Sequence, residues 1–394
     1  MSAMQQMLMA LAIIFAAPYL VWRIGRTDHW APLVVVQILM GLVLGPGLLG
    51  AAFPHYYTGI FSTEVIWMLS GIASWGVILF VWLAGLEMDL REAWRQRKDG
   101  LVSAGAALFF PLILGAGAAN VILLLNGSWQ GEQASTWQFA LGIGMACSVT
   151  ALPILVLFMR KLGVLRQGLG QRVLRYASLD DIAVWAILAF VVMEVDSLWK
   201  QAGFIVFLVV AAQWVRRLFP KLPMADRWFA GIIWLVISAL LADWAGLHYM
   251  VGAFLAGAVM DRDWFDERLL DQLREIVLLV LMPVFFLSTG LKTEWVLSNA
   301  SVLIVAFALL LVSVFGKWMG AQVAGHLLGW QKGEAQVIAW LLQTKALIMI
   351  IFANVLLDKL IISPQMFTAL LVMAAMSTML TMPLASRALR GLDR

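Results

Sequence analysis

The sequence predicts an all-α integral membrane protein with 13 transmembrane helices, and three observations lead to this. Of the 394 residues, 63% are hydrophobic and only 13% are charged, whereas soluble domains average roughly 45–50% apolar and 25% charged residues. Apolar stretches near the length of about 20 residues that a helix needs to cross a bilayer recur along the whole chain. Basic residues also alternate between loops in the way that membrane topology requires.

The predicted spans are separated by short polar connections. The first of them has neither a basic segment before it nor a small-residue cleavage site after it, so it is a retained helix and not a signal peptide. The spans near 202–218 and 246–260 are the shortest. In order, the spans are 7–23, 31–50, 65–86, 101–125, 137–159, 173–195, 202–218, 228–243, 246–260, 275–291, 299–325, 334–357 and 364–386.

The loop charges give the orientation. When successive loops are assigned to opposite sides, 22 of the 27 lysines and arginines fall on one side and three on the other, while Lys317 and Lys345 lie inside spans. Because basic loops stay in the cytoplasm, the N-terminus is expected outside and the C-terminus in the cytoplasm. A missed or extra helix would disrupt the alternation, which therefore supports 13 spans. The same loops explain the net charge of +4, so nucleic-acid binding is not indicated.

Two adjacent carboxylates, Asp180 and Asp181, interrupt the apolar run 173–195. A charge at the bilayer centre costs ~3 kcal/mol on insertion scales, and two neighbouring carboxylates repel each other if both are ionised. Neighbouring residues point about 100° apart on a helix, so one carboxylate can face another helix while the other faces a cavity. Ionisable residues inside membranes usually mark ion or proton sites. The alternative is a protonated, hydrogen-bonded pair with a structural role.

Lys317 lies deep inside the eleventh predicted span and needs an anion. The nearest comparably buried anions in the sequence are Asp180 and Asp181, so the favoured interpretation is an ion pair between Lys317 and Asp180 beside Asp181. In the alternative, the lysine reaches one membrane surface with its long side chain.

Two spans, one in each half of the chain, are interrupted by polar residues or proline. Paired interruptions of this kind indicate broken helices at a transport site, whereas a kink with polar interhelical contacts is the structural alternative. The interrupting residues are Ser148, Thr150 and Pro153 in the fifth span and Gln343, Thr344 and Lys345 in the twelfth. The single cysteine, Cys147, excludes an intrachain disulfide, and no Cys/His cluster suggests a metal cage or a cofactor.

Several segments in order resemble those of a known family, the monovalent cation:proton antiporters of the second superfamily branch, which includes bacterial Na⁺/H⁺ antiporters and K⁺ efflux systems. The resemblance covers about residues 34–383, and the ordered set is more specific than any one segment. The segments are 41–50, 83–90, 148–153, 180–181, 252–257, 283–286 and 316–317.

The resemblance implies a fold of inverted repeats, in which helices four to six match eleven to thirteen and the broken helices five and twelve cross. It implies a core domain of approximately residues 101–195 and 299–386 that moves against a dimerisation domain of approximately residues 7–86 and 202–291. A homodimer in the lipid bilayer is expected, without a soluble regulatory domain.

The resemblance also implies residue roles. Asp181 is similar to the carboxylate that binds the cation and the proton, and Asp180 to its neighbour, which pairs with the lysine matched by Lys317. Thr150 lies in the unwound part of helix five. From their types and positions, Ser148 and Thr150 are expected to coordinate the ion or to satisfy backbone groups that the break frees. The Asp-Asp pair resembles the electrogenic, sodium-type version. Some relatives carry a carboxylate in the helix-five break, and this sequence has none there. Helix twelve instead carries Lys345, a cation that can compensate the negative ends of the half-helices.

We therefore expect an antiporter of the bacterial inner membrane that exchanges Na⁺, or Li⁺ or K⁺, for protons by alternating access, and not an enzyme. An electroneutral K⁺/H⁺ antiporter or K⁺ efflux system is the first alternative, and a sodium-coupled organic anion symporter is the second. An intramembrane aspartyl protease is disfavoured because its two aspartates must face each other from different helices. A membrane sensor that does not transport would be separated by ion flux measurements.

Overall fold

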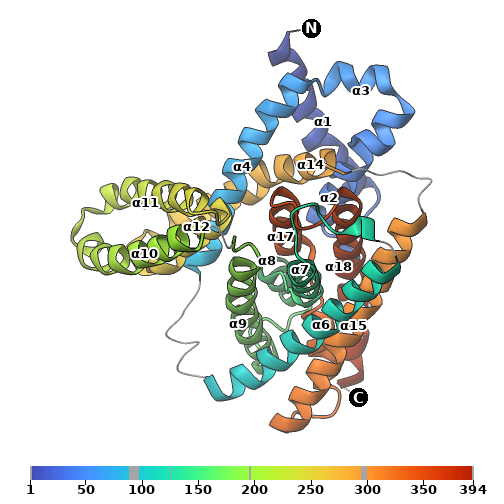
Figure 1. Cartoon of the computed structure of the whole chain (residues 1–394). Coiled ribbons are helices and arrows are strands. Elements are labelled where there is room, and N and C mark those ends of the chain that lie inside the picture. Colours follow the sequence, from blue (N-terminus) through green and yellow to red (C-terminus); the bar gives the residue numbers. More distant parts are fainter. Residues whose placement is uncertain (1, 88–96, 126, 195–196, 294–299, 393–394) are drawn as a thin grey trace. The chain divides into compact units, whose positions relative to one another are not determined.

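Long apolar helices dominate the computed structural model, which describes residues 2–87, 97–125, 127–194, 197–293 and 300–392 (Figure 1). Within these ranges no strand occurs, and one isolated bridge joins Gln130 to Ile362. Ten of the described helices are long and apolar enough to cross a membrane, or eleven if one bent pair counts as a single span. The predicted all-α membrane fold class is confirmed.

The predicted number of 13 spans is not reached by length and composition alone. The predicted span 173–195 corresponds to α9 (Gly168–Val191), which carries four charged residues. The predicted span 246–260 corresponds to α12 (Tyr249–Val259), which has 11 residues. Helices therefore occupy both positions, and the count of 13 stays a prediction.

The described helices belong to two compact units. The first unit is formed by Met1–Val65, Arg91–Ile187 and Leu287–Arg394, and the second by Ile66–Leu90 and Leu188–Phe286. All of the predicted site residues lie in the first unit. The division into a moving core and a dimerisation domain concerns motion and stays a prediction. The first unit contains most of α9 and also α1 (Ala3–Ile24), α2 (Leu33–Leu44), α3 (Pro54–Ile60), α6 (Arg97–Leu125), α7 (Thr136–Ser148), α8 (Leu152–Lys161), α15 (Ala300–Leu328), α16 (Glu334–Leu341), α17 (Ala346–Asp358) and α18 (Pro364–Leu392).

One order of elements occurs twice in the first unit. The long helix α6 is followed by the broken helix α7–α8 and by α9, and the long helix α15 is followed by the broken helix α16–α17 and by α18. The two long helices lie along each other (Figure 1). Gly316 and Gly320 of α15 make this possible, because a Cβ there would overlap the backbone of Pro111 and Ala106 on α6. Small residues bring membrane helices together in this way.

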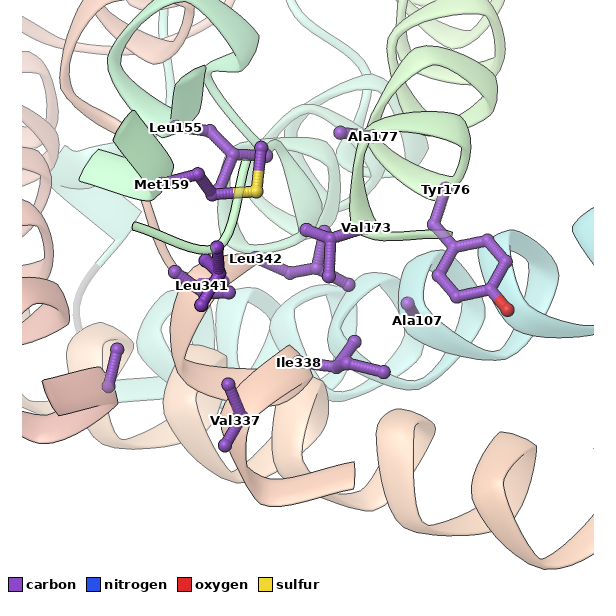
Figure 2. Packing of buried hydrophobic residues seen from close by; sticks show 12 residues of the cluster. Ala107, Leu155, Met159, Val173, Tyr176, Ala177, Val337, Ile338, Leu341 and Leu342 are labelled. Atoms are coloured by element: carbon purple, nitrogen blue, oxygen red, sulfur yellow. The ribbon is translucent and has the colours of Figure 1, made fainter. Parts of the chain in front are cut away.

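Buried apolar side chains join the half-helices α8 and α16 to α9 (Figure 2). Leu155 and Met159 come from α8, Val173 from α9, and Ile338 and Leu341 from α16. All five side chains are fully buried. Because tightly packed side chains resist displacement, this cluster fixes the half-helices on one side of the two breaks.

The second unit contains α10 (Leu198–Leu218), α11 (Met224–Trp244), α12, α13 (Glu267–Ile276) and most of α4 (Thr63–Leu86). The residues of α14 (Met282–Leu291) are divided between the two units after Phe286. Glycines again allow close contacts: Gly252 of α12 abuts the Ser238 backbone of α11, and Gly257 abuts that of Trp82 on α4. The ninth predicted span therefore presents small residues at its helix contacts.

Candidate functional site

The first break separates α7 from α8. Val149 and Ala151 have extended backbones, with ψ of 142° and 95°, so the helix stops at Ser148 and restarts at Leu152. Pro153 lies in the first turn of α8, where a backbone N–H would have no helical partner in any case. Pro153 thus begins a half-helix, and it does not remove a hydrogen bond from a continuous one.

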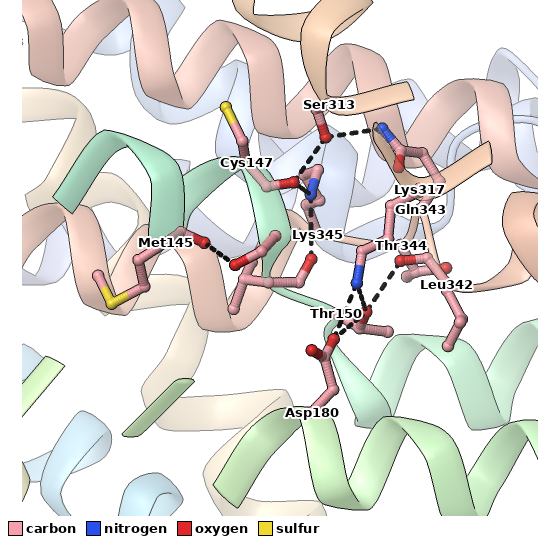
Figure 3. Close-up of polar contacts among 12 residues, drawn as sticks. Met145, Cys147, Thr150, Asp180, Ser313, Lys317, Leu342, Gln343, Thr344 and Lys345 are labelled. Atoms are coloured by element: carbon pink, nitrogen blue, oxygen red, sulfur yellow. Dashed lines mark hydrogen bonds and ion pairs between the residues drawn. The ribbon is translucent and has the colours of Figure 1, made fainter. Parts of the chain in front are cut away.

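The second break crosses the first. Residues 342–345 separate α16 from α17, and the two half-helices are bent by 48°. The backbone N–H of Ala151 donates to the carbonyl oxygen of Thr344 at 2.5 Å, so the two unwound segments touch directly. Polar side chains from α9, α15 and α18 surround this crossing, and the centre of the site is drawn in Figure 3.

Lys317 lies against Asp180 at the crossing (Figure 3). Lys317 Nζ is 2.9 Å from Asp180 Oδ2, and the two side chains are 1% and 2% exposed. The lysine also donates to Thr150 Oγ1 at 2.9 Å. An ion pair between Lys317 and Asp180 is predicted from the sequence, and the structure brings the two side chains together from α15 and α9.

The Thr150 hydroxyl stands between two acceptors. Its oxygen is 2.7 Å from Asp180 Oδ2 and 2.9 Å from the carbonyl oxygen of Leu342. A hydroxyl carries one proton, so Thr150 donates to one of these two oxygens at a time. The side chain therefore links the carboxylate on α9 to the break between α16 and α17.

Asp181 follows Asp180 on α9 but differs from it in exposure. Asp180 is buried, and Asp181 is partly exposed. The two neighbouring positions on the helix thus differ: Asp180 is held by a lysine in a fully buried position, whereas Asp181 is less deeply buried.

Lys345 binds the end of a half-helix. Its ammonium group donates to the carbonyl oxygens of Cys147 at 2.6 Å and Val149 at 3.1 Å, at the C-terminal end of α7. Ser313 Oγ donates to the same Cys147 oxygen at 2.7 Å and accepts from Gln343 Nε2 at 3.1 Å. These carbonyls carry the negative end of the helix dipole, so a buried cation there stabilises the break.

Two residues predicted to coordinate an ion or to lie at the break, Ser148 and Thr344, donate their hydroxyl protons to backbone carbonyls three residues earlier in the chain. Ser148 Oγ donates to the Met145 carbonyl and Thr344 Oγ1 to the Leu341 carbonyl, each at 2.9 Å. Their oxygens keep lone pairs, and their role in ion binding stays a prediction. Within the part of the chain that the structure describes, no group of three or more His, Cys, Asp or Glu side chains could hold a metal ion.

Three hydroxyl residues at the crossing were missed from the sequence: Ser313 on α15 and Ser377 and Thr378 on α18. Ser377 Oγ donates to the Gln343 carbonyl at 2.7 Å. Thr378 Oγ1 accepts from the backbone N–H groups of Lys345 and Ala346 at 3.2 and 2.9 Å. A sequence signal existed for the last two, because they are adjacent polar residues near the middle of an apolar span, like Asp180 and Asp181.

Two crossed helix breaks around a buried lysine–carboxylate pair define a class of membrane transporters, the one with the sodium/proton antiporter fold. The chain belongs to the sodium/hydrogen exchanger transmembrane family, which matches residues 10–387. It is 31% identical over 371 residues to the Na⁺/H⁺ antiporter NhaS4 of Synechocystis sp., covering 90% of each chain. The predicted family is confirmed.

More distant relatives extend the comparison. The chain is 28% identical to Cation/H⁺ antiporter 19 of Arabidopsis thaliana and to K⁺/H⁺ antiporter 1 of Saccharomyces cerevisiae, covering 90% of this chain but only 46% and 43% of those proteins. Its fold matches that of the sodium proton antiporter MjNhaP1 from Methanocaldococcus jannaschii with a TM-score of 0.66, over 100% of both chains, at 14% identity.

Proposed function

We propose that this multi-pass membrane protein exchanges a monovalent cation for protons by alternating access, with Na⁺ as the first candidate and Li⁺ as a close analogue. The observation that carries the proposal is the pair of adjacent carboxylates at the crossing of two helix breaks, one held by Lys317 and the other partly exposed. Ionisable groups at such a depth are retained for ion or proton movement.

Competition for the carboxylates explains exchange. Asp181 binds either a dehydrated cation or a proton, so a proton arriving from the acidic side displaces the cation. The site opens to one face of the membrane at a time, as in transporters whose binding site lies at the midplane between repeats. No chemical bond of a substrate is changed, so the protein acts as a transporter and not as an enzyme.

The ion pair of Lys317 and Asp180 affects how much net charge crosses the membrane in each exchange cycle. When a cation binds, it competes with Lys317 for the oxygens of Asp180, and Lys317 can release its proton. Thr150 can then direct its hydroxyl proton to the Leu342 carbonyl. If Lys317 and Asp181 both give up protons for one cation, the exchange carries net charge and is electrogenic.

K⁺/H⁺ exchange is the second candidate, because the yeast relative is named a K⁺/H⁺ antiporter while the Synechocystis relative is named a Na⁺/H⁺ antiporter. Selectivity depends on the size of the cavity and the number of oxygens around the ion. We propose a bacterial inner membrane location, with the N-terminus outside and the C-terminus in the cytoplasm, and a role in pH homeostasis.

Reconstitution into proteoliposomes with a pH-sensitive dye inside tests the proposal. A proton gradient is imposed, and NaCl, LiCl, KCl or choline chloride is added outside, with the membrane voltage clamped to zero or left free. Exchange predicts dissipation of the gradient by at least one alkali cation and none by choline. Faster exchange with the voltage clamped identifies electrogenic transport. The absence of a response to all three cations would contradict the proposal.

A further inference from the structure

We propose that Ser377 and Thr378 on α18 form a clamp that fixes the α16–α17 break and thereby positions Lys345 on the end of α7. The inference rests on the proposed exchange function and adds positioning residues to it. Neither side chain is proposed as a ligand of the cation.

The two side chains hold the break from both of its ends. Ser377 Oγ donates to the Gln343 carbonyl at 2.7 Å, on the side of α16. Thr378 Oγ1 accepts from the N–H groups of Lys345 at 3.2 Å and Ala346 at 2.9 Å, at the start of α17. All of these residues are buried, so water does not readily replace a lost contact.

The start of α17 needs an acceptor from another helix. A residue at the N-terminal cap usually accepts a hydrogen bond from the first turn with its own side chain. Lys345 occupies that position and makes no such bond, because a lysine has no acceptor and its ammonium group is engaged with the α7 carbonyls. Thr378 supplies the missing acceptor, so the lysine side chain is free to cap α7.

Other threonines on α18 have no such role. Thr368 and Thr381 donate to the carbonyls of Pro364 and Ser377 in their own helix, at 2.9 and 3.1 Å. Thr378 donates to Ala374 in the same manner at 2.9 Å, but its lone pairs also accept from α17. Thr381 is equally buried and is therefore a matched control for the loss of a hydroxyl.

The clamp has a counterpart in the other repeat. Asp180 and Asp181 lie near the middle of α9, and Asp180 meets Thr150 in the α7–α8 break. Ser377 and Thr378 lie near the middle of α18 and meet the α16–α17 break. Each repeat thus carries two adjacent polar residues in its last helix, and at least one of the two contacts the break of the same repeat. The charged pair on α9 takes part in exchange, whereas the neutral pair on α18 fixes the α16–α17 break.

The experiment compares Thr378→Val, Thr378→Ser, Ser377→Ala and Thr381→Val with the parent protein in two measurements. The first is the cation concentration at half-maximal exchange in proteoliposomes. The second is the rate at which N-ethylmaleimide alkylates Cys147 in purified protein, measured by mass spectrometry. Cys147 is the single cysteine, it is buried, and its carbonyl receives Lys345, so its reactivity reports loosening of the crossing.

We expect Thr378→Val to raise the half-maximal cation concentration and the alkylation rate about fivefold, the effect of losing a helix cap. Thr378→Ser keeps the acceptor and should match the parent, as should Thr381→Val. If Thr378→Val does not reach the membrane, Ser377→Ala decides by the same two measurements, with increases expected in both. Thr378→Val or Ser377→Ala values equal to those of Thr381→Val would overturn the clamp. A parent protein without exchange would refute the proposed function instead, and the alkylation rates would still test the clamp.

Discussion

At the scale of single residues, the main feature of the site is the buried ion pair between Lys317 and Asp180. Both side chains are almost completely buried, and their charged atoms are 2.9 Å apart. Removing either charge from water costs several kcal/mol, which the partner's attraction and the added hydrogen bond from Thr150 offset. Either charge alone in this position is therefore unstable.

The pair should show strong energetic coupling. Lys317→Ala leaves Asp180 as an unpaired buried charge, which costs roughly 3–5 kcal/mol of folding free energy if Asp180 stays ionised, and less if it takes up a proton. Asp180→Asn in the same background removes that charge and should restore part of the stability. A double-mutant cycle on the melting temperature measures the coupling, and a coupling energy near zero would mean that the pair contributes nothing to the fold.

The sequence predicted this pair because a buried ion must have a partner and few candidates existed. It did not predict the clamp. It predicted that Lys345 can compensate the negative end of a half-helix, but not that this end is formed by the Cys147 and Val149 carbonyls of α7, because every residue carries a backbone carbonyl and the sequence does not show which ones face the lysine. The adjacent polar residues Ser377 and Thr378 gave a sequence signal, but the path of α17 was needed to show that Thr378 accepts from its first backbone N–H groups.

At the scale of elements, the contact between α6 and α15 supports the site. Lys317 lies between Gly316 and Gly320 on α15, and both glycines abut the backbone of α6. The spacing between the helices is therefore set on both sides of the lysine. The sequence marked Gly316 through the resemblance, but which helix it faced required the structure.

A methyl group at Gly320 should separate these helices. Its Cβ would overlap the Ala106 carbonyl oxygen, so Gly320→Ala should lower the free energy of unfolding by about 1–3 kcal/mol, as overpacking does. Gly117→Ala on α6 is the control, because nothing lies within 4 Å of a Cβ there, and alanine favours a helix. Thermal melting in detergent compares the two variants, and an equal effect of both would contradict the close approach.

At the scale of the whole molecule, the fold class was predictable because the membrane acts directly on the sequence. Spans must be apolar to lie in lipid, and basic loops stay in the cytoplasm. The number of spans was less accessible, since α9 pairs a transmembrane length with four charges. Those charges include the candidate site carboxylates Asp180 and Asp181, so the residues that suggest a site also lower the hydropathy of the span that carries them.

We expect the protein to be a homodimer, as the resemblance implies. The second unit leaves large apolar side chains exposed on α10 and α11, among them Trp214 at 62% and Phe229 at 73%, and lipid or a second copy can cover them. Native mass spectrometry from mild detergents and from lipid nanodiscs measures the oligomer. A monomer in all of these conditions would contradict the expectation.

The release of protons from purified protein, when a cation is added in weakly buffered solution, tests most directly whether cation and proton compete for the same carboxylates. We expect the parent protein to release protons on addition of Na⁺, Li⁺ or K⁺, because cation and proton compete for the carboxylates on α9. Asp181→Asn should release few or none while melting as a folded protein, and Ser178→Ala, whose hydroxyl bonds to Leu174 in its own helix, should behave as the parent. Undiminished proton release from folded Asp181→Asn would contradict the claim that Asp181 binds both ions.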